Sequence, residues 1–83
     1  MRTMKPNRIF ALTELHPDQV ARIHTLSDAF AQRERFSELG FTPGAEIRIL
    51  RTALFGDPIE ILVRGVRYGL RRDDAKNILV SLL

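Results

Sequence analysis

The side chains that could do acid–base or nucleophilic chemistry in this sequence are few and scattered. The two histidines are His16, in a segment with the composition of a turn, and His24, on the polar face of an alternating stretch. Neither has a serine, a carboxylate or a second histidine at a spacing typical of a catalytic pair. Ordinary surface histidines are therefore the preferred interpretation, and the sequence predicts no catalytic residue and no enzyme activity.

Ligands for a metal ion or a phosphate group are also poorly grouped. The chain has no cysteine, which excludes a thiolate zinc site, a thiol nucleophile and a disulfide framework. His16, Asp18 and His24 come nearest to a ligand set, but they do not suggest a closed coordination shell. The glycines are explained by turns and caps and form no phosphate-binding loop. The sequence predicts no specific metal site and no cofactor.

Asp73 and Asp74 are the only adjacent carboxylates in the chain. They stand where a short helical turn through Asn77 would need an N-cap and a first-turn acid. Capping is therefore preferred over an acid–base role.

One turn carries residues of an unexpected type. Residues 53–58 have the composition of a hairpin tip, because Gly-Asp-Pro cannot continue a strand. Leu54 and Phe55 lie in this tip, where large apolar side chains are not expected without a reason. Two interpretations stay open: Phe55 folds back over an open barrel end, or the tip contacts a partner as aromatic anchors do at interfaces. We expect Leu54 and Phe55 to bind a partner.

Arginine supplies eleven of the thirteen basic side chains, and the net charge is +3. Arginine suits contacts to carboxylates and phosphates. The arginines with outward parity on the expected strands are Arg48, Arg64, Arg67 and Arg71, and Glu46 and Glu60 share their face. This mixture favours a solvated surface with cross-strand pairs. Nucleic-acid binding would also need exposed aromatic side chains, and Tyr68 has inward parity, so no nucleic acid is expected as a partner.

Short stretches of alternating apolar residues predict a β-rich fold. Strands are expected over residues 19–26, 45–52, 59–64, 66–70 and 78–82, with a shorter extended segment over 11–15. In the strand over 66–70, Val66, Tyr68 and Leu70 are expected to face inward. Asp73 is expected to cap the helical turn that precedes the last strand.

A single longer helix is expected in the middle of the chain. Ser27 or Asp28 is a suitable N-cap, and Gly40 stands where a helix end needs a positive φ. The apolar stripe of this helix would be Ala29, Gln32, Phe36 and Leu39. Thr42-Pro43-Gly44-Ala45 then predicts a type II turn.

In a chain of 83 residues, a flat sheet of short strands would leave apolar side chains exposed to solvent. A curled sheet buries these side chains on its inner face and protects its edges. The order of elements therefore predicts a mainly β fold, a small barrel of five to six strands with one short α-helix and a C-terminal helical turn. We expect a flexible segment over 1–10 and a single domain over 11–83. No stretch approaches the roughly 20 apolar residues of a membrane helix, so a cytoplasmic protein without membrane insertion is the default.

Three short motifs follow one another in a specific order. They are Arg-Phe-Ser-Glu-Leu-Gly-Phe-Thr-Pro-Gly over 35–44, Gly-Asp-Pro-Ile over 56–59, and Leu-Arg at 70–71 followed by Ala75 and Ile78. Each motif alone is a common turn signal, but together they resemble the FeoA family of small cytoplasmic proteins of bacterial ferrous-iron uptake. The resemblance implies one FeoA-type, SH3-like β-barrel and a role as accessory or regulator of FeoB, a permease with a cytoplasmic GTPase domain. His16-Pro17-Asp18 departs from the glycine usual in the first turn, and the family offers no catalytic residues to carry over.

The leading hypothesis is a non-enzymatic regulator that binds a FeoB-type transporter, through its GTPase domain or its membrane portion, and reaches the inner membrane only through that partner. One alternative is a metal-responsive regulatory domain, since FeoA-like barrels also occur fused to iron-dependent repressors. A nucleic-acid-binding SH3-like barrel is a weaker alternative. Weak homo-oligomerisation through open strand edges is also left open.

Overall fold

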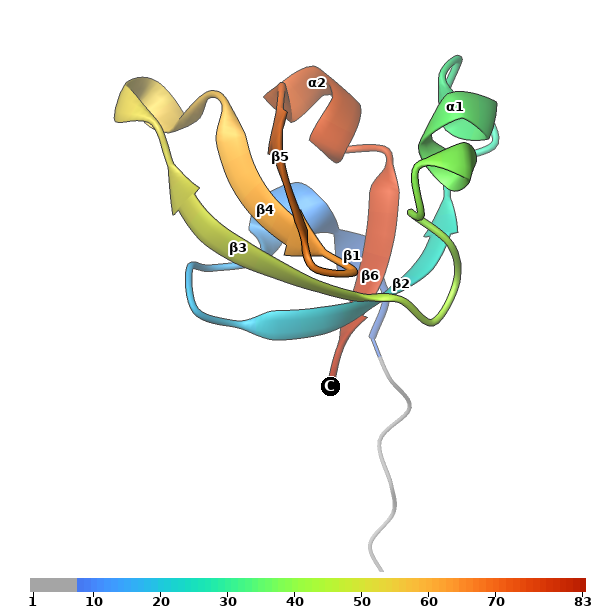
Figure 1. Cartoon of the computed structure of the whole chain (residues 1–83), viewed down its shortest axis with the longest axis horizontal. Coiled ribbons are helices and arrows are strands. Elements are labelled where there is room, and N and C mark those ends of the chain that lie inside the picture. Colours follow the sequence, from blue (N-terminus) through green and yellow to red (C-terminus); the bar gives the residue numbers. More distant parts are fainter. Residues whose placement is uncertain (1–7) are drawn as a thin grey trace, which may run out of the picture.

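The computed structural model describes residues 8–83, which form one strongly curved antiparallel sheet with short helices beside it (Figure 1). In chain order the elements are β1 (Phe10–Ala11), the 3-10 turn η1 (Leu12–Glu14), β2 (Val20–Leu26), α1 (Arg33–Glu38), β3 (Glu46–Thr52), the 3-10 turn η2 (Leu54–Gly56), β4 (Ile59–Val63), β5 (Val66–Leu70), α2 (Arg72–Ala75) and β6 (Ile78–Leu82). This confirms the predicted mainly β fold with one short α-helix and a C-terminal helical turn. Of the segment expected to be flexible, 1–7 lies outside the described residues and Phe10 belongs to β1.

The six strands are arranged in the order β1-β6-β2-β3-β4-β5. The hairpins β3–β4 and β4–β5 form a meander, and β6 returns to lie between β1 and β2. The sheet therefore has β1 at one edge and β5 at the other. No helix formed by residues 8–83 combines the length and the apolar character needed to cross a membrane.

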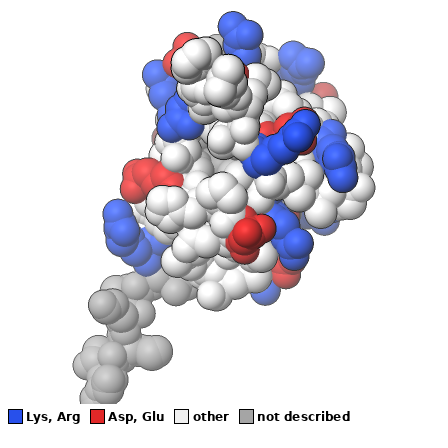
Figure 2. Space-filling view, turned by 90° about the vertical axis from the view of Figure 1, so that its left-hand side faces the viewer, with Lys and Arg blue, Asp and Glu red and all other residues white. Residues whose placement is uncertain are grey.

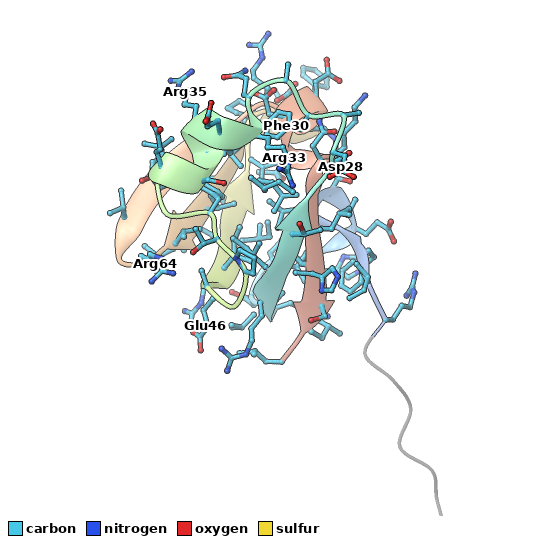
Figure 3. The ribbon with its side chains drawn as sticks, turned by 90° about the vertical axis from the view of Figure 1, so that its right-hand side faces the viewer. Asp28, Phe30, Arg33, Arg35, Glu46 and Arg64 are labelled. Carbon is cyan, nitrogen blue, oxygen red and sulfur yellow. The ribbon has the colours of Figure 1, made fainter. Side chains whose placement is uncertain are left out.

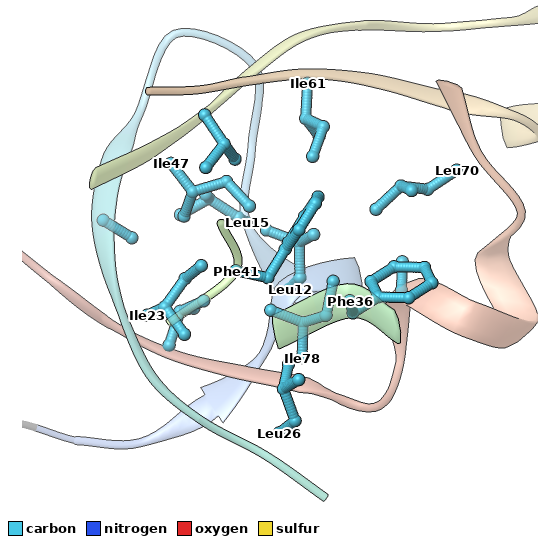
Figure 4. Close-up of a cluster of buried hydrophobic side chains, with 14 of the residues drawn as sticks. Leu12, Leu15, Ile23, Leu26, Phe36, Phe41, Ile47, Ile61, Leu70 and Ile78 are labelled. Atoms are coloured by element: carbon cyan, nitrogen blue, oxygen red, sulfur yellow. The ribbon is translucent and has the colours of Figure 1, made fainter. Parts of the chain in front are cut away.

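The core lies on the concave face of the sheet (Figure 4). The alternation of β3 and β4 directs Ile47, Ile49, Ile61 and Val63 inward, as the sequence predicts. Phe41 has no solvent exposure and lies near the centre of the buried cluster, where its ring centroid is 5.0 Å from that of Phe36. Aromatic pairs at this separation add to the stabilisation from burial.

The predicted start of the central helix is wrong. α1 begins at Arg33, with Gln32 at its N-cap position, whereas the Ser27 hydroxyl only accepts a hydrogen bond from Ala29 N at 3.3 Å within a turn. The segment turns before it becomes helical because Phe30 is buried against Phe36, with ring centroids 4.9 Å apart. Phe36 is the only buried member of the predicted stripe, since Ala29 and Leu39 are exposed and Gln32 is partly buried.

Three smaller predictions also need correction. Most of the extended segment predicted over 11–15 is the turn η1, which buries Leu12. Val66 is 47% exposed because it lies beside a turn in the edge strand β5, where no other element covers it. Asp73 does not cap α2, whose N-cap position is Arg71 without a side-chain capping bond. The predicted turn at Pro43-Gly44 is confirmed by Gly44, with φ of 91°, and by the hydrogen bond from Ala45 N to Thr42 O at 3.0 Å.

Candidate functional site

The hairpin tip between β3 and β4 presents the most exposed large apolar side chains in the described part of the chain. Leu54 is 79% exposed and Phe55 is 94% exposed. The interpretation in which Phe55 folds back over a barrel end is therefore wrong. In Figure 1 the turn η2, which contains both residues, projects from the body of the sheet at the end of β3.

Local hydrogen bonds give this tip a defined shape. Ala53 N donates to Pro58 O at 2.9 Å, and Gly56 N donates to Ala53 O at 2.7 Å. Phe55 and Gly56 both have positive φ, 68° and 79°. A positive φ costs little at glycine but is rare for a bulky side chain. Phe55 thus adopts an unfavourable backbone conformation and buries almost none of its surface in return, and strained positions of this kind are frequent at functional sites.

Contacts with α2 hold the tip against the body of the domain. The Asp57 carboxylate accepts a hydrogen bond from Arg72 N at 3.1 Å, and Arg72 Nη1 donates to Gly56 O at 3.3 Å. The first bond satisfies one of the free backbone N–H groups at the start of α2. The tip is therefore anchored at its base, and Leu54 and Phe55 extend from a fixed support.

A shallow hollow and one ion pair lie at the base of the tip. The hollow has a volume of about 300 Å³ and is lined by Arg51, Thr52, Ala53, Leu54, Pro58 and Glu60. Arg51 Nε and Glu60 Oε1 are 3.2 Å apart across the β3–β4 pair. Apolar side chains beside a paired, exposed charge form a surface of the kind found at polar-rimmed protein interfaces.

The outward arginines do not form one continuous site. Figure 2 shows acidic side chains among the basic ones on the face that includes the β3–β4 tip. The Arg64 guanidinium is bound within the protein: its Nε donates to Gly40 O at 3.1 Å, and its Nη2 donates to Thr42 Oγ1 at 2.8 Å (Figure 3). Tyr68 Oη also donates to this segment, to Leu39 O at 3.2 Å. Tyr68 thus satisfies the carbonyl of Leu39, the residue that ends α1, whereas Arg64 adds a second donor to Gly40 O, which already accepts from Thr42 N at 2.9 Å.

The histidines and Asp18 are not brought together as a ligand set. All three side chains are exposed, and among residues 8–83 no three histidine, aspartate or glutamate side chains are placed to hold a metal ion. The roles of Asp57 and Arg64 were not found from the sequence. The sequence placed Arg64 in the strand over 59–64, and it linked neither Asp57 to α2 nor Arg64 to the segment that follows α1.

The chain matches known proteins along almost its whole length. A family model described as the FeoA domain matches residues 10–82. An Fe(2+) transport protein A/Fe(2+) transporter FeoB fusion protein from Porphyromonas gingivalis is 33% identical over 72 residues, which are 87% of this chain and 8% of the fusion protein. The chain therefore spans less than a tenth of the length of that relative.

Solved structures show the same fold. The NMR structure of a FeoA-like protein from Clostridium acetobutylicum superposes with a TM-score of 0.84 at 29% identity, covering 95% of this chain and 91% of the other. The zinc complex of Stenotrophomonas maltophilia FeoA, described as a prokaryotic SH3 domain protein, gives a TM-score of 0.75 at 31% identity over 84% of this chain and 87% of the other. The predicted SH3-like fold is confirmed, and the chain belongs to the FeoA family, which takes part in ferrous iron transport.

Proposed function

We propose that this chain is a non-enzymatic, cytoplasmic accessory protein of ferrous iron transport that binds a FeoB-type transporter through the tip of the β3–β4 hairpin. The observation that carries the proposal is the 94% exposure of Phe55 on an anchored tip. The choice of partner is supported by the Porphyromonas gingivalis relative, whose name places an FeoA and an FeoB portion in one fusion protein.

The energetics of the tip suit a reversible contact. Burial of a leucine and a phenylalanine side chain contributes about 1.5–3 kcal/mol each, and association loses translational and rotational freedom that offsets much of this gain. Because Asp57 and Arg72 already fix the base of the tip, little further ordering of its backbone is needed on binding. Leu54 and Phe55 thus act as anchors within a larger contact surface.

Such a contact regulates transport only if it distinguishes states of the transporter. A bound protein shifts a conformational equilibrium by the difference between its affinities for the two states. We therefore expect the affinity of this chain for its partner to depend on the nucleotide held by the GTPase domain, or on the conformation of the membrane portion.

The test is a titration of this chain against the soluble GTPase domain of the FeoB from the same organism, with and without a GTP analogue, and in parallel against full-length transporter in membranes. We expect saturable binding to at least one form. The double variant Leu54→Asp/Phe55→Asp should weaken that binding by about a hundredfold or more, since two anchors of about 1.5–3 kcal/mol are lost.

The matched control is Leu82→Asp/Leu83→Asp, which places the same two charges on exposed leucines at the C-terminal end of β6. This variant should bind as the wild type does. Equal losses in both double variants would remove the tip from the interface, and absence of binding to either form of the transporter by the folded protein would refute the proposed partner.

A further inference from the structure

A second surface lies at the open edge of the sheet, along β5. β5 pairs with β4 and is the last strand in the sheet order. The β4–β5 turn has two residues, Arg64 and Gly65, with φ of 51° and 80°. Positive φ at both positions is the signature of a type I′ hairpin turn. The turn fixes which backbone groups of β5 face β4 and which face outward.

In such a hairpin the residues that flank the turn form a hydrogen-bonded pair, and bonded and non-bonded pairs then alternate along the strands. The register pairs Val63 with Val66, Ile61 with Tyr68 and Ile59 with Leu70. The N–H and C=O groups of Arg67 and Gly69 therefore face away from β4. Within residues 8–83, neither group of Arg67 or Gly69 takes part in a turn, loop or cap hydrogen bond.

The side chains leave this edge open. Arg67 and Gly69 are both exposed, and a methyl group built on Gly69 would meet no atom within 4 Å. Val66 is 47% exposed and Leu39 is 42% exposed. They lie in the same region, because Arg64 and Tyr68, two residues to either side of Val66, reach the carbonyls of Gly40 and Leu39. The edge thus combines unpaired backbone groups with apolar surface.

The charge of the β5 edge favours one class of binding partner over others. β5 and the turn before it contain two arginines, Arg64 and Arg67, and no acidic residue. Arg71 and Arg72 follow the strand, but Asp73 and Asp74 come directly after them, and the Asp57 carboxylate accepts a hydrogen bond from Arg72 N, so this end of the strand has no excess of positive charge. Glu60 lies opposite Gly69, but its carboxylate is paired with Arg51. The segment RERFSE of α1, whose end contacts Tyr68, adds two acidic and two basic side chains and hence no net charge. The part of the edge around Arg64 and Arg67 is therefore positive.

This charge disfavours a second copy of the chain as the occupant. Pairing of two β5 edges would place Arg64 and Arg67 of one copy near the same two residues of the other, and like charges close together across a strand pair are destabilising. An acidic strand would instead gain from the same charges. Backbone hydrogen bonds along a sheet edge supply affinity, and side chains at alternate positions supply specificity.

We propose that the β5 edge binds an extended acidic segment of a partner protein by adding it to the sheet as an antiparallel strand. Alternate residues of the segment lie on the two faces of the extended sheet. Its acidic residues pair with Arg67 and Gly69 and lie on the outer face near the Arg67 guanidinium. Its intervening apolar residues lie beside Val66 and Leu39. The ligand class is thus a strand that alternates acidic and apolar residues.

The test uses two synthetic heptapeptides, one alternating valine and glutamate and one alternating valine and lysine, both capped and fluorescently labelled. Anisotropy titrations should show saturable binding of the glutamate peptide and at least about tenfold weaker binding of the lysine peptide. In NMR spectra of the protein, the amide signals of Arg67 and Gly69 should shift on titration. Equal affinities for the two peptides, or no binding of the glutamate peptide, would overturn the proposal.

Two pairs of variants separate backbone pairing from charge. Gly69→Pro removes the outward N–H and blocks the edge, whereas Gly69→Ala keeps the donor, so the proline variant should bind the glutamate peptide about tenfold more weakly than the alanine variant. Arg67→Glu should abolish the preference for the glutamate peptide. Arg48→Glu makes the same charge change on β3, two strands from β5, and should weaken the preference less than Arg67→Glu does.

A third comparison alters only the peptide, so it does not depend on any variant folding. N-methylation of the central glutamate removes an N–H that faces β5 in the antiparallel pairing, whereas N-methylation of a central valine removes one that faces solvent. The first peptide should lose binding and the second should keep it. Loss of binding by the peptide methylated at valine, with binding retained by the peptide methylated at glutamate, would contradict the antiparallel register.

Discussion

The carboxylate of Asp57 accepts a hydrogen bond from the backbone N–H of Arg72 at 3.1 Å, so the β3–β4 hairpin caps the helix α2 across fifteen positions of sequence. Asp57→Ala should lower the free energy of unfolding by about 1 kcal/mol, the usual effect of losing a helix cap. Urea denaturation measures this change. The control Asp28→Ala removes an exposed ion pair with Arg33 and should cost less than about 0.5 kcal/mol. Equal losses would mean that Asp57 has no capping role.

Arg64 combines a helix-end contact with a strained backbone, since its φ is 51°. Arg64→Ala loses the bonds to Gly40 O and Thr42 Oγ1 and keeps the strain, so it should destabilise by about 1–2 kcal/mol. Arg64→Gly loses the same bonds but relieves the strain, and should be more stable than the alanine variant by about 1 kcal/mol. An alanine variant as stable as the glycine variant in thermal unfolding would argue against the left-handed conformation.

The same substitution at Phe41 and at Phe55 should have opposite consequences. Phe41 has no exposure and contacts the rings of Phe36 and Tyr68, so Phe41→Ala should cost about 3–5 kcal/mol of stability. Phe55 is 94% exposed, so Phe55→Ala should change stability by less than about 0.5 kcal/mol while weakening partner binding. Chemical denaturation measures both changes, and a large loss of stability for Phe55→Ala would show that the ring packs on the protein.

Alanine substitutions at Gly44 and Gly69 test whether a glycine is needed for its positive φ or for lack of space for a side chain. Neither position has an atom within 4 Å of an added methyl group, but Gly44 has a φ of 91°. Gly44→Ala should therefore cost about 1 kcal/mol from backbone strain alone. Gly69→Ala should be neutral or slightly stabilising, because alanine fits an extended strand. Melting temperatures of the two variants give the comparison, and a reversed order would contradict the turn geometry at Gly44.

Prediction from the sequence succeeded where the signal was short-ranged. Alternation places Ile47, Ile49, Ile61 and Val63 inward because successive side chains of a strand point to opposite faces. Pro43-Gly44 specifies its turn because proline fixes φ and glycine permits φ of 91°. Leu54 and Phe55 could be selected as candidates because the Gly-Asp-Pro sequence beside them ends a strand.

Prediction failed where tertiary packing overrides local preference. Ser27 has the composition of a helix cap, yet α1 begins only at Arg33, because burial of Phe30 against Phe36 requires turns in between. Val66 has inward parity but remains exposed, because a strand at the edge of the sheet has no neighbour to cover it. Capping of α2 comes from Asp57 and not from the adjacent Asp73.

The sequence by itself determined the class of fold, the family, and the two apolar residues at the hairpin tip, since all of these depend on residue type and spacing along the chain. Only the tertiary structure decided that Phe55 faces solvent, that Asp57 and Arg72 anchor its base, and that Arg67 and Gly69 present unpaired backbone groups at an edge. These features arise between segments that are distant in sequence. Their positions depend on how the sheet closes and which strand comes last, and local propensity contains no information about either.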